Sequence, residues 1–248
     1  MTIPRSHPRY RSLKTRETLV EAHRDGRLSL EGLIAHGRGE AFDYLLGEET
    51  PAPALVAEKT AAAYLLTAKR PVLSVNGNTA VLAAREIAAL AEAIPARVEI
   101  NLFHRTEKRV ALLVRHLREA GVESPLGLRP DARIPGLDSA RAKCSRSGIF
   151  TADVVLVPLE DGDRAAALVK MRKKVLAIDL NPLSRTSRTA TVAVTDDVVR
   201  ALSNIERFVQ ELRGKDRELA RILRTYDRSR NLGAVHRFLA WRLGQLRD

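Results

Sequence analysis

Residues 71–101, PVLSVNGNTAVLAAREIAALAEAIPARVEIN, decide the fold expected for this chain. A β-branched run at 72–75 is followed by a longer amphipathic run at 79–93, and then by a second short run at 97–101. Short apolar runs favour buried strands, whereas longer runs with apolar residues at helical spacing favour helices. The stretch therefore predicts a strand, a helix and a second strand, the unit from which parallel sheets are built.

The same alternation continues toward the C-terminus. Residues 125–150 interrupt it, because they are rich in Gly, Pro, Ser and Arg and lack periodicity, so we expect a long excursion from the sheet. Loops of that length are usually functional or mobile. Around this loop we expect helices over 106–120 and 164–172 and strands over 153–158, 175–180 and 191–194. The pattern predicts an α/β fold with a mostly parallel sheet and helices on both faces.

Helical segments are expected on either side of this core. Before it, the sequence favours helices at 14–25, 28–46 and 54–69, the second broken by Gly37 and Gly39. After it, the tail is expected to be helical, with an apolar stripe for core or subunit packing formed by Leu232, Val235, Leu239, Leu243 and Leu246. We expect one domain over 1–248, comprising a helical segment 1–70, the α/β core 71–200 and a helical segment 201–248.

Composition narrows the class of protein. Hydrophobic residues make up 45% of the 248 residues, enough for a sizeable core, so whole-chain disorder is excluded. No apolar run approaches the roughly 18 residues that cross a bilayer, and the charged N-terminus lacks the apolar region of a signal peptide. We therefore expect a soluble, cytoplasmic protein without membrane partners. Cys144 is the single cysteine, so no intrachain disulfide is possible, and we expect an inert thiol.

The charge balance predicts anionic partners. Lys and Arg number 42 against 30 Asp and Glu, a net charge of +12. One interpretation is a basic nucleic-acid-binding module, but aromatics are only 4% of the chain, which leaves few platforms for stacking bases. Small phosphorylated ligands fit equally well, and a compositional bias toward arginine would give the same total. A nicotinamide-dependent dehydrogenase is disfavoured because G-x-G-x-x-G is absent.

Polar residues follow four of the expected strands. Ligands of open parallel sheets bind beyond the carboxyl ends of the strands, so these positions are the first candidates for a site. The Asn-Gly turn after the first strand leads into a helix, whose N-terminal N–H groups could hold an anion. The residues that follow the four strands are Asn76, Gly77, Asn78 and Thr79; Asn101; Glu160, Asp161, Gly162, Asp163 and Arg164; and Asp179, Asn181, Ser184 and Arg185.

Four of these features have a functional and a plain structural interpretation. Arg38 between two glycines could approach a phosphate, or be a solvated arginine in a helix-helix turn. His36 could be a general base, or a capping or core histidine. The carboxylates of 160–163 could hold Mg²⁺ or an ammonium group, or be solvated charges at a helix N-terminus. Asp179 could accept hydrogen bonds from a ribose, with Arg185 meeting phosphate.

Seven strings, in chain order, carry a resemblance that covers Ile3 to about Ala201. They are IPRSHPRY, GLIAHGRGEAFDYLLGE, SVNGN, EINLFHRTE, RIPGL, VLVPLEDGDR and DLNPLSRT. Together they closely resemble the archaeal phosphopantothenate synthetases, also called 4-phosphopantoate beta-alanine ligases. That family implies a Rossmann-like homodimer that joins 4-phosphopantoate to beta-alanine using ATP. The products are 4'-phosphopantothenate, AMP and diphosphate, on the archaeal route to coenzyme A.

The resemblance also implies an ATP site. Position 186 is commonly Ser in the family and keeps its hydroxyl here, whereas position 197 is commonly Asn and is Asp here, which puts a side-chain contact from that residue in doubt. The residues implied are Arg16, Arg38, Asp179, Leu180, Asn181, Arg185, Thr186, Asp197 and Val198.

The chemistry agrees with the basic charge. ATP and a phosphorylated carboxylate repel one another, and arginines and Mg²⁺ would offset that repulsion while the carboxylate forms an acyl adenylate. Beta-alanine must then lose a proton, and the candidate bases by residue type are His36, Glu40, Asp161 and Asp163. Substrate contacts are expected from Asn76, Gly77, Asn78 and Asn101. The whole hypothesis requires Arg38 to lie near Asn181.

Overall fold

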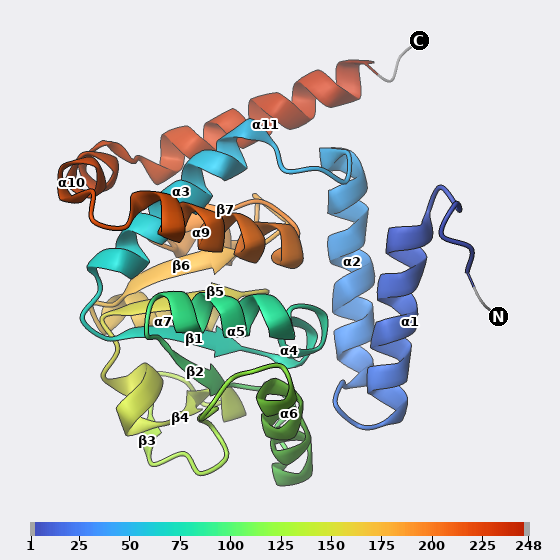
Figure 1. Ribbon diagram of the computed structural model, residues 1–248, viewed down its shortest axis with the longest axis vertical. Coiled ribbons are helices and arrows are strands. Elements are labelled where there is room, and N and C mark those ends of the chain that lie inside the picture. The colour runs from blue at the N-terminus through green and yellow to red at the C-terminus, as the bar shows by residue number, and fades with distance from the viewer. Residues whose placement is uncertain (1–2, 246–248) are drawn as a thin grey trace.

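A five-stranded parallel sheet forms the centre of the computed structural model, which describes residues 3–245. Its order is β2-β1-β5-β6-β7 (Figure 1). The strands are β1 (Pro71–Val75), β2 (Arg97–Ile100), β5 (Val154–Pro158), β6 (Lys174–Ile178) and β7 (Val192–Val194). All four neighbouring pairs are parallel, which confirms the strands expected from the sequence to within two residues at each end.

Helices cover both faces of the sheet, as predicted. Side chains alternate along each strand, so Leu73 and Leu156 pack on one face while Val72 and Val155 pack on the other. The first face is covered by α3 (Ala52–Thr67), α5 (Ala84–Ala93), α6 (Glu107–Glu119) and α9 (Val198–Leu212). The second is covered by α7 (Gly162–Lys170), α8 (Arg185–Thr189) and the segment 132–152. This is an α/β fold.

Two helices stand beside the carboxyl ends of the strands, α1 (Tyr10–Arg24) and α2 (Leu30–Leu46), as Figure 1 shows. The break expected at Gly37 and Gly39 was wrong, because α2 is continuous to Leu46 and is capped by Gly47, whose φ is 90°. A glycine costs a helix only about 1 kcal/mol relative to alanine, which packing of the helix outweighs.

The helix expected at 79–93 is two helices. Asn76 caps α4 (Gly77–Leu82) by accepting a hydrogen bond from the Thr79 N–H, and α5 begins anew at Ala84. Ala83, at φ −131° and ψ 30°, is outside the helical region, which is why the axis changes there. The short α4 therefore belongs to the turn after β1.

The excursion at 125–150 is more ordered than the sequence indicated. It contains an antiparallel pair, β3 (Ala132–Arg133) with β4 (Lys143–Cys144), and two short irregular turns, η1 (Ala140–Ala142) and η2 (Arg146–Phe150). The buried carboxylate of Glu99 holds it, accepting hydrogen bonds from the Ser145 and Ile149 N–H groups at 2.6 and 2.7 Å. Ile134, Cys144 and Ile149 fill the core beneath it.

The tail continues with α10 (Asp216–Thr225) and α11 (Arg228–Gln245). The apolar stripe on α11 is only partly a core face: Leu232 and Val235 are buried, whereas Leu243 is 49% exposed. Leu246 lies outside the described residues. Within residues 3–245, no helix combines the length and apolar character that crossing a bilayer needs. The division of the chain at residues 70 and 200 stays a prediction.

Candidate active site

A cleft of about 910 Å³ lies between the α1–α2 pair and the carboxyl ends of the strands. The chain leaves β1 toward β2 on one side and returns past β1 to β5 on the other, so the strand order reverses between β1 and β5. Ligand crevices of open sheets form at such a reversal. Residues following all five strands line the cleft, among them Asn76, Leu102, Asp161, Asn181 and Asp197.

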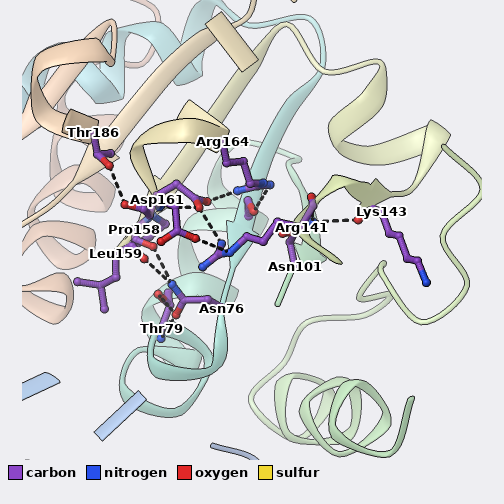
Figure 2. A network of polar contacts seen from close by, with 12 residues as sticks. Asn76, Thr79, Asn101, Arg141, Lys143, Pro158, Leu159, Asp161, Arg164 and Thr186 are labelled. Carbon is purple, nitrogen blue, oxygen red and sulfur yellow. Dashed lines mark hydrogen bonds and ion pairs between the residues drawn. The ribbon is translucent and has the colours of Figure 1, made fainter. Parts of the chain in front are cut away.

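Asn76 joins the carboxyl end of β1 to the turn that follows β5. Its Nδ2 donates to the carbonyl oxygens of Pro158 and Leu159 at 3.0 and 2.9 Å, while its Oδ1 accepts from the Thr79 N–H at 3.0 Å (Figure 2). Leu159 has a φ of 51°, a left-handed conformation that costs a non-glycine residue free energy. The amide of Asn76 thus holds a strained turn at the centre of the cleft. Both polar atoms of the Asn76 side chain are therefore already hydrogen-bonded within the protein.

The turn after β6 is organised around Asp179. Its carboxylate accepts hydrogen bonds from the Ser184 hydroxyl at 2.5 Å and the Asn181 N–H at 3.0 Å. Burial raises the pKa of Asp179, opposed by these two hydrogen bonds and by the charge of Arg38. Arg38 lines the cleft from α2, and its neighbour Gly39 faces Leu180. The structure therefore brings Arg38 to the Asp179 turn, as the hypothesis requires.

The turns after β5 and β6 are in contact with each other. The Thr186 hydroxyl donates to the Glu160 carbonyl oxygen at 2.7 Å (Figure 2). A side chain at Gly162 would place its Cβ 2.5 Å from the Cβ of Arg185, so only glycine allows this approach. Arg185 lines the cleft and pairs with Asp163 at 2.7 Å, where both side chains are mostly exposed. Asp163 itself does not line the cleft.

Glu160 corrects one expectation from the sequence. Its carboxylate is buried and is shared by two arginines, Arg141 at 2.8 Å and the fully buried Arg164. The acidic turn is therefore partly a buried structural element, because ion pairs with two guanidinium groups offset the free-energy cost of desolvating the Glu160 carboxylate. Arg164 also donates to the Ser74 hydroxyl at 3.0 Å. Glu160 and Asp161 both line the cleft, but Asp161 has the exposed carboxylate of the two, with its side chain 51% exposed and paired with Arg141 at 3.1 Å.

Sequence reasoning missed Arg141. It lies in η1 of the 125–150 loop, is 7% exposed, and lines the cleft from beside β5 (Figure 2). No motif surrounds it, and only the position of the loop brings it to the cleft.

Three candidates near α1 and α2 differ in their surroundings. Burial lowers the pKa of His36, which lines the cleft with its Nε2 buried and without a hydrogen-bond partner among the described residues. Glu40 also lines the cleft but is held by Arg16 at 2.7 Å and by the Ser12 hydroxyl at 2.6 Å. Burial opposes ionisation of Glu40, yet these contacts lower its pKa. Arg16 lies outside the cleft lining.

The turn after β7 joins the cleft to α9. Asp197 accepts from the Val199 and Arg200 N–H groups at 3.1 and 3.2 Å, so its side chain caps the helix. Asp197 and Val198 line the cleft. An aspartate suits this position because a carboxylate at a helix N-terminus is stabilised by the helix dipole.

The remaining candidates separate into two groups. Asn78 lines the cleft with Gly77, and its Nδ2 donates to the Gly32 carbonyl oxygen at 2.9 Å. Asn101 is 1% exposed and outside the lining; its Nδ2 donates to the carbonyl oxygens of Arg141 and Lys143 at 3.2 and 3.0 Å. The structure thus gathers most of the candidates in one cleft, and leaves out Arg16, Thr79, Asn101, Asp163 and Arg164.

Two further findings bear on the chemistry. Among residues 3–245, no three acidic, histidine or cysteine side chains gather to hold a metal ion. Cys144 is buried, and burial raises the pKa of its thiol to about 11, as expected of an inert group.

Comparisons with known proteins show the family to which this chain belongs. A protein of Methanospirillum hungatei named 4-phosphopantoate--beta-alanine ligase is 62% identical over 210 residues, 85% of this chain and 86% of its own length. Proteins of the same name are 51% identical in Methanosarcina mazei, over 93% of this chain and 91% of theirs, and 48% identical in Thermococcus kodakarensis, over 100% and 96%. Residues 53–242 match the sequence model of one family. The chain belongs to the phosphopantothenate/pantothenate synthetase family.

Proposed function

We propose that this chain is an ATP-dependent ligase that joins 4-phosphopantoate to beta-alanine, giving 4'-phosphopantothenate, AMP and diphosphate for coenzyme A synthesis. The observation that carries the proposal is the position of Arg38 on α2, across the cleft from the Asp179 turn. In the proposed enzyme, that juxtaposition would offer a cation and a ribose-binding carboxylate to the same ligand.

The nucleotide would occupy the half of the cleft at β6 and β7. Asp179 suits the ribose hydroxyls, and residues 180–181 and 197–198, which line the cleft, would hydrogen-bond the base through their backbone. Arg38 and Arg185 would bind phosphates, because guanidinium groups donate bidentately to phosphate oxygens. Thr186 is buried and already donates to Glu160, so its contribution would come through its backbone.

Arg16 would act through another residue. It contacts Glu40 at 2.7 Å and the Tyr44 hydroxyl at 3.2 Å, and it lies outside the cleft lining. We propose that it positions α2 and enters the nucleotide site only if the α1–α2 pair moves closer to the strands.

The reaction would proceed in two steps. A carboxylate oxygen of 4-phosphopantoate attacks the α-phosphorus of ATP, and the bond from that phosphorus to the β-phosphate oxygen breaks, releasing diphosphate. The nitrogen of beta-alanine then attacks the acyl carbon, and the bond to AMP breaks. Arg38 and Arg185 stabilise the negative charge that develops on the phosphates in the first step.

Magnesium fits the residues present only as a companion of the nucleotide. Mg²⁺ at phosphate sites takes one or two protein carboxylates together with phosphate oxygens and water. Asp161 is the half-exposed carboxylate of the cleft beside Gly162 and is the residue that would hold it. When bound, the ion would neutralise phosphate charge. The other carboxylate of that turn, Glu160, is committed to two arginines.

His36 is the base that the surroundings favour. An alkylammonium has a pKa of about 10.4, so the amine of beta-alanine is protonated at pH 7 and a group in the cleft must take its proton. Glu40, Asp161 and Asp163 are each paired with an arginine, whereas His36 forms no ion pair with any residue in the part of the chain that the structure describes. Its lowered pKa keeps the imidazole neutral and able to accept a proton at pH 7.

We also propose that the enzyme is a cytoplasmic homodimer. The contacting helices α2 and α11 expose Ile34, Trp241 and Leu243 at 69%, 58% and 49%. Large apolar side chains exposed on neighbouring helices are typical of a surface that a partner covers. Sedimentation equilibrium should give twice the mass of the chain, and a monomer would exclude this assembly.

Product analysis tests the proposed function. Incubation with ATP, Mg²⁺, 4-phosphopantoate and beta-alanine should give AMP and diphosphate in equal amounts with 4'-phosphopantothenate. ADP as product would exclude the adenylate route. The alternative from the charge, a nucleic-acid-binding module, predicts affinity for duplex or single strands that falls steeply with salt. We expect that affinity to be weak, so tight binding with a steep slope would favour the alternative.

A further inference from the structure

The cleft extends well beyond the nucleotide residues. Because the sheet order is β2-β1-β5-β6-β7, the β6 and β7 turns lie at one end of the cleft and the β1 and β2 turns at the other. If the proposed function holds, ATP occupies the first end and the second end is left for the acid. That end contains two arginines that no sequence motif singled out, Arg109 on α6 and Arg141 in η1.

Arg141 is held in place before any ligand arrives. Glu160 and Asp161 contact its guanidinium at 2.8 and 3.1 Å, and Asn101 holds its carbonyl oxygen at 3.2 Å (Figure 2). Glu160 is also committed to Arg164, so two guanidinium groups share one buried carboxylate. Arg141, which lines the cleft, is therefore held rigidly beside the β5 turn, next to the turn that carries the nucleotide residues.

Arg109 has an unused donor. Its Nη1 donates to the His104 carbonyl oxygen at 2.5 Å, while its Nε is buried and has no hydrogen-bond acceptor among the described residues. A buried N–H without an acceptor costs free energy, and a ligand oxygen would remove that cost. Leu28, Leu82 and Leu102 line the same end of the cleft.

These features match the chemistry of a phosphorylated, branched carboxylic acid. 4-Phosphopantoate carries a carboxylate at one end, a phosphate at the other and an aliphatic chain with two methyl groups between them. Its carboxylate must reach the α-phosphorus of ATP, so it belongs at the arginine nearer the nucleotide, and the phosphate belongs farther away.

We propose that Arg141 binds the carboxylate of the acid and that Arg109 binds its phosphate, with the leucines contacting the aliphatic chain between them. The inference rests on the proposed function and extends it by naming the substrate contacts. Arg141 then orients the attacking oxygen, and Arg109 makes the enzyme select phosphorylated over unphosphorylated acid.

Calorimetric titration with 4-phosphopantoate and with pantoate tests each assignment separately. For the unmodified protein, we expect the phosphorylated acid to bind more tightly. Arg109→Ala should reduce the ratio of the two dissociation constants at least tenfold. Arg141→Ala should raise both constants at least tenfold and leave their ratio unchanged. Neither variant should change the dissociation constant of ATP more than twofold.

Matched variants separate binding from folding. Arg115→Ala on the exposed side of α6, and Lys143→Ala, whose side chain points away from Arg141 in Figure 2, should bind both acids normally. Arg141→Lys keeps the positive charge but loses the planar guanidinium that donates two hydrogen bonds to one carboxylate. This variant should raise the dissociation constants of both acids at least tenfold. If Arg141→Ala fails to fold, this variant decides the question.

The outcomes distinguish a failure of the two arginine assignments from a failure of the proposed ligase function. If the unmodified protein forms no AMP with 4-phosphopantoate and beta-alanine, the proposed function fails. If it does form AMP but Arg109→Ala leaves the ratio unchanged, or Arg141→Lys leaves both constants within twofold, the assignment of that arginine is overturned while the function stands.

Discussion

Arg200 binds Asp43 through both of its terminal nitrogens, at 3.1 and 2.5 Å, and so joins α9 to α2 across 157 residues of sequence. The same guanidinium contacts Asp196 at 2.6 Å, and Asp196 accepts a hydrogen bond from the Thr50 hydroxyl at 2.6 Å. Because α2 carries Arg38 and His36, this pair fixes one wall of the cleft relative to the other.

Asp43→Ala should therefore affect both stability and ATP binding. Removing one partner of a buried ion pair costs about 3 to 5 kcal/mol, and we expect the lower end because the two side chains keep 12% and 16% exposure. Urea denaturation measures the loss, and the dissociation constant of ATP should rise because α2 is less firmly placed. Lys59→Ala, which breaks partly exposed pairs with Glu211 and Glu218, should cost less than about 1 kcal/mol. Equal stabilities for the two variants would contradict this account.

The phosphate contacts are tested by Arg38→Ala and Arg185→Ala. Each should lower kcat/KM for ATP at least tenfold, about 1.4 kcal/mol, with an unchanged thermal midpoint. Arg188 provides the control, since it lies on the same short helix as Arg185, is exposed, and does not line the cleft. Unchanged kinetics for both arginine variants would remove the proposed phosphate site.

His36→Gln should separate the two chemical steps. Loss of a general base slows its step by about 100-fold or more, so amide formation should slow by that factor. Exchange of labelled diphosphate into ATP, with 4-phosphopantoate alone, should continue at the normal rate because no amine is deprotonated there. Because burial lowers the pKa of His36, kcat of the unmodified protein should decline with acidification only below about pH 6.5. This decline should be absent in the variant. His236→Gln, exposed on α11, serves as the control. Equal loss of exchange and amide formation would exclude His36 as the base.

The fold and much of the cleft lining could be predicted because both follow from local pattern. Buried strands and the polar residues directly after them, such as Asn76 and Asp179, are marked by the change from apolar to polar sequence. Arg141 and Glu160 could not be placed, because their pairing depends on where a 26-residue loop folds back. The partners Asp43 and Arg200 are joined only by tertiary structure.

Glycine misled the local interpretation of α2. Gly37 and Gly39 resemble a helix break, yet α2 continues through both, because the propensity cost of two glycines is smaller than the free energy that packing of the helix supplies. Local sequence was misleading for Glu160 as well, because Glu160 is buried although the nearby Asp161 and Asp163 are exposed. Sequence pattern gives the position of a charge along the chain, and burial is decided by what packs against it.

Glu58 gives a prediction about pH that is independent of catalysis. It is fully buried on α3, and burial raises its pKa to about 9, with the negative charge of Asp196 adding to the effect. The native state therefore keeps this carboxyl protonated at pH 7, while the unfolded chain releases the proton near its ordinary pKa of about 4.3. Because the folded pKa is the higher one, the stabilisation is complete below the unfolded pKa and is lost as the pH rises toward 9.

Glu58→Gln should abolish that loss. A neutral amide of similar shape replaces the protonated acid, so the variant should be as stable as the unmodified protein at pH 5 and more stable at pH 8. Urea denaturation at a series of pH values measures the difference, which should grow by up to about 1.4 kcal/mol per pH unit between these limits. Glu206→Gln, on α9 and with a partly exposed side chain, should show no such trend. A difference that stays constant from pH 5 to 8 would mean that Glu58 is ionised in the native state, with its charge compensated by Arg200.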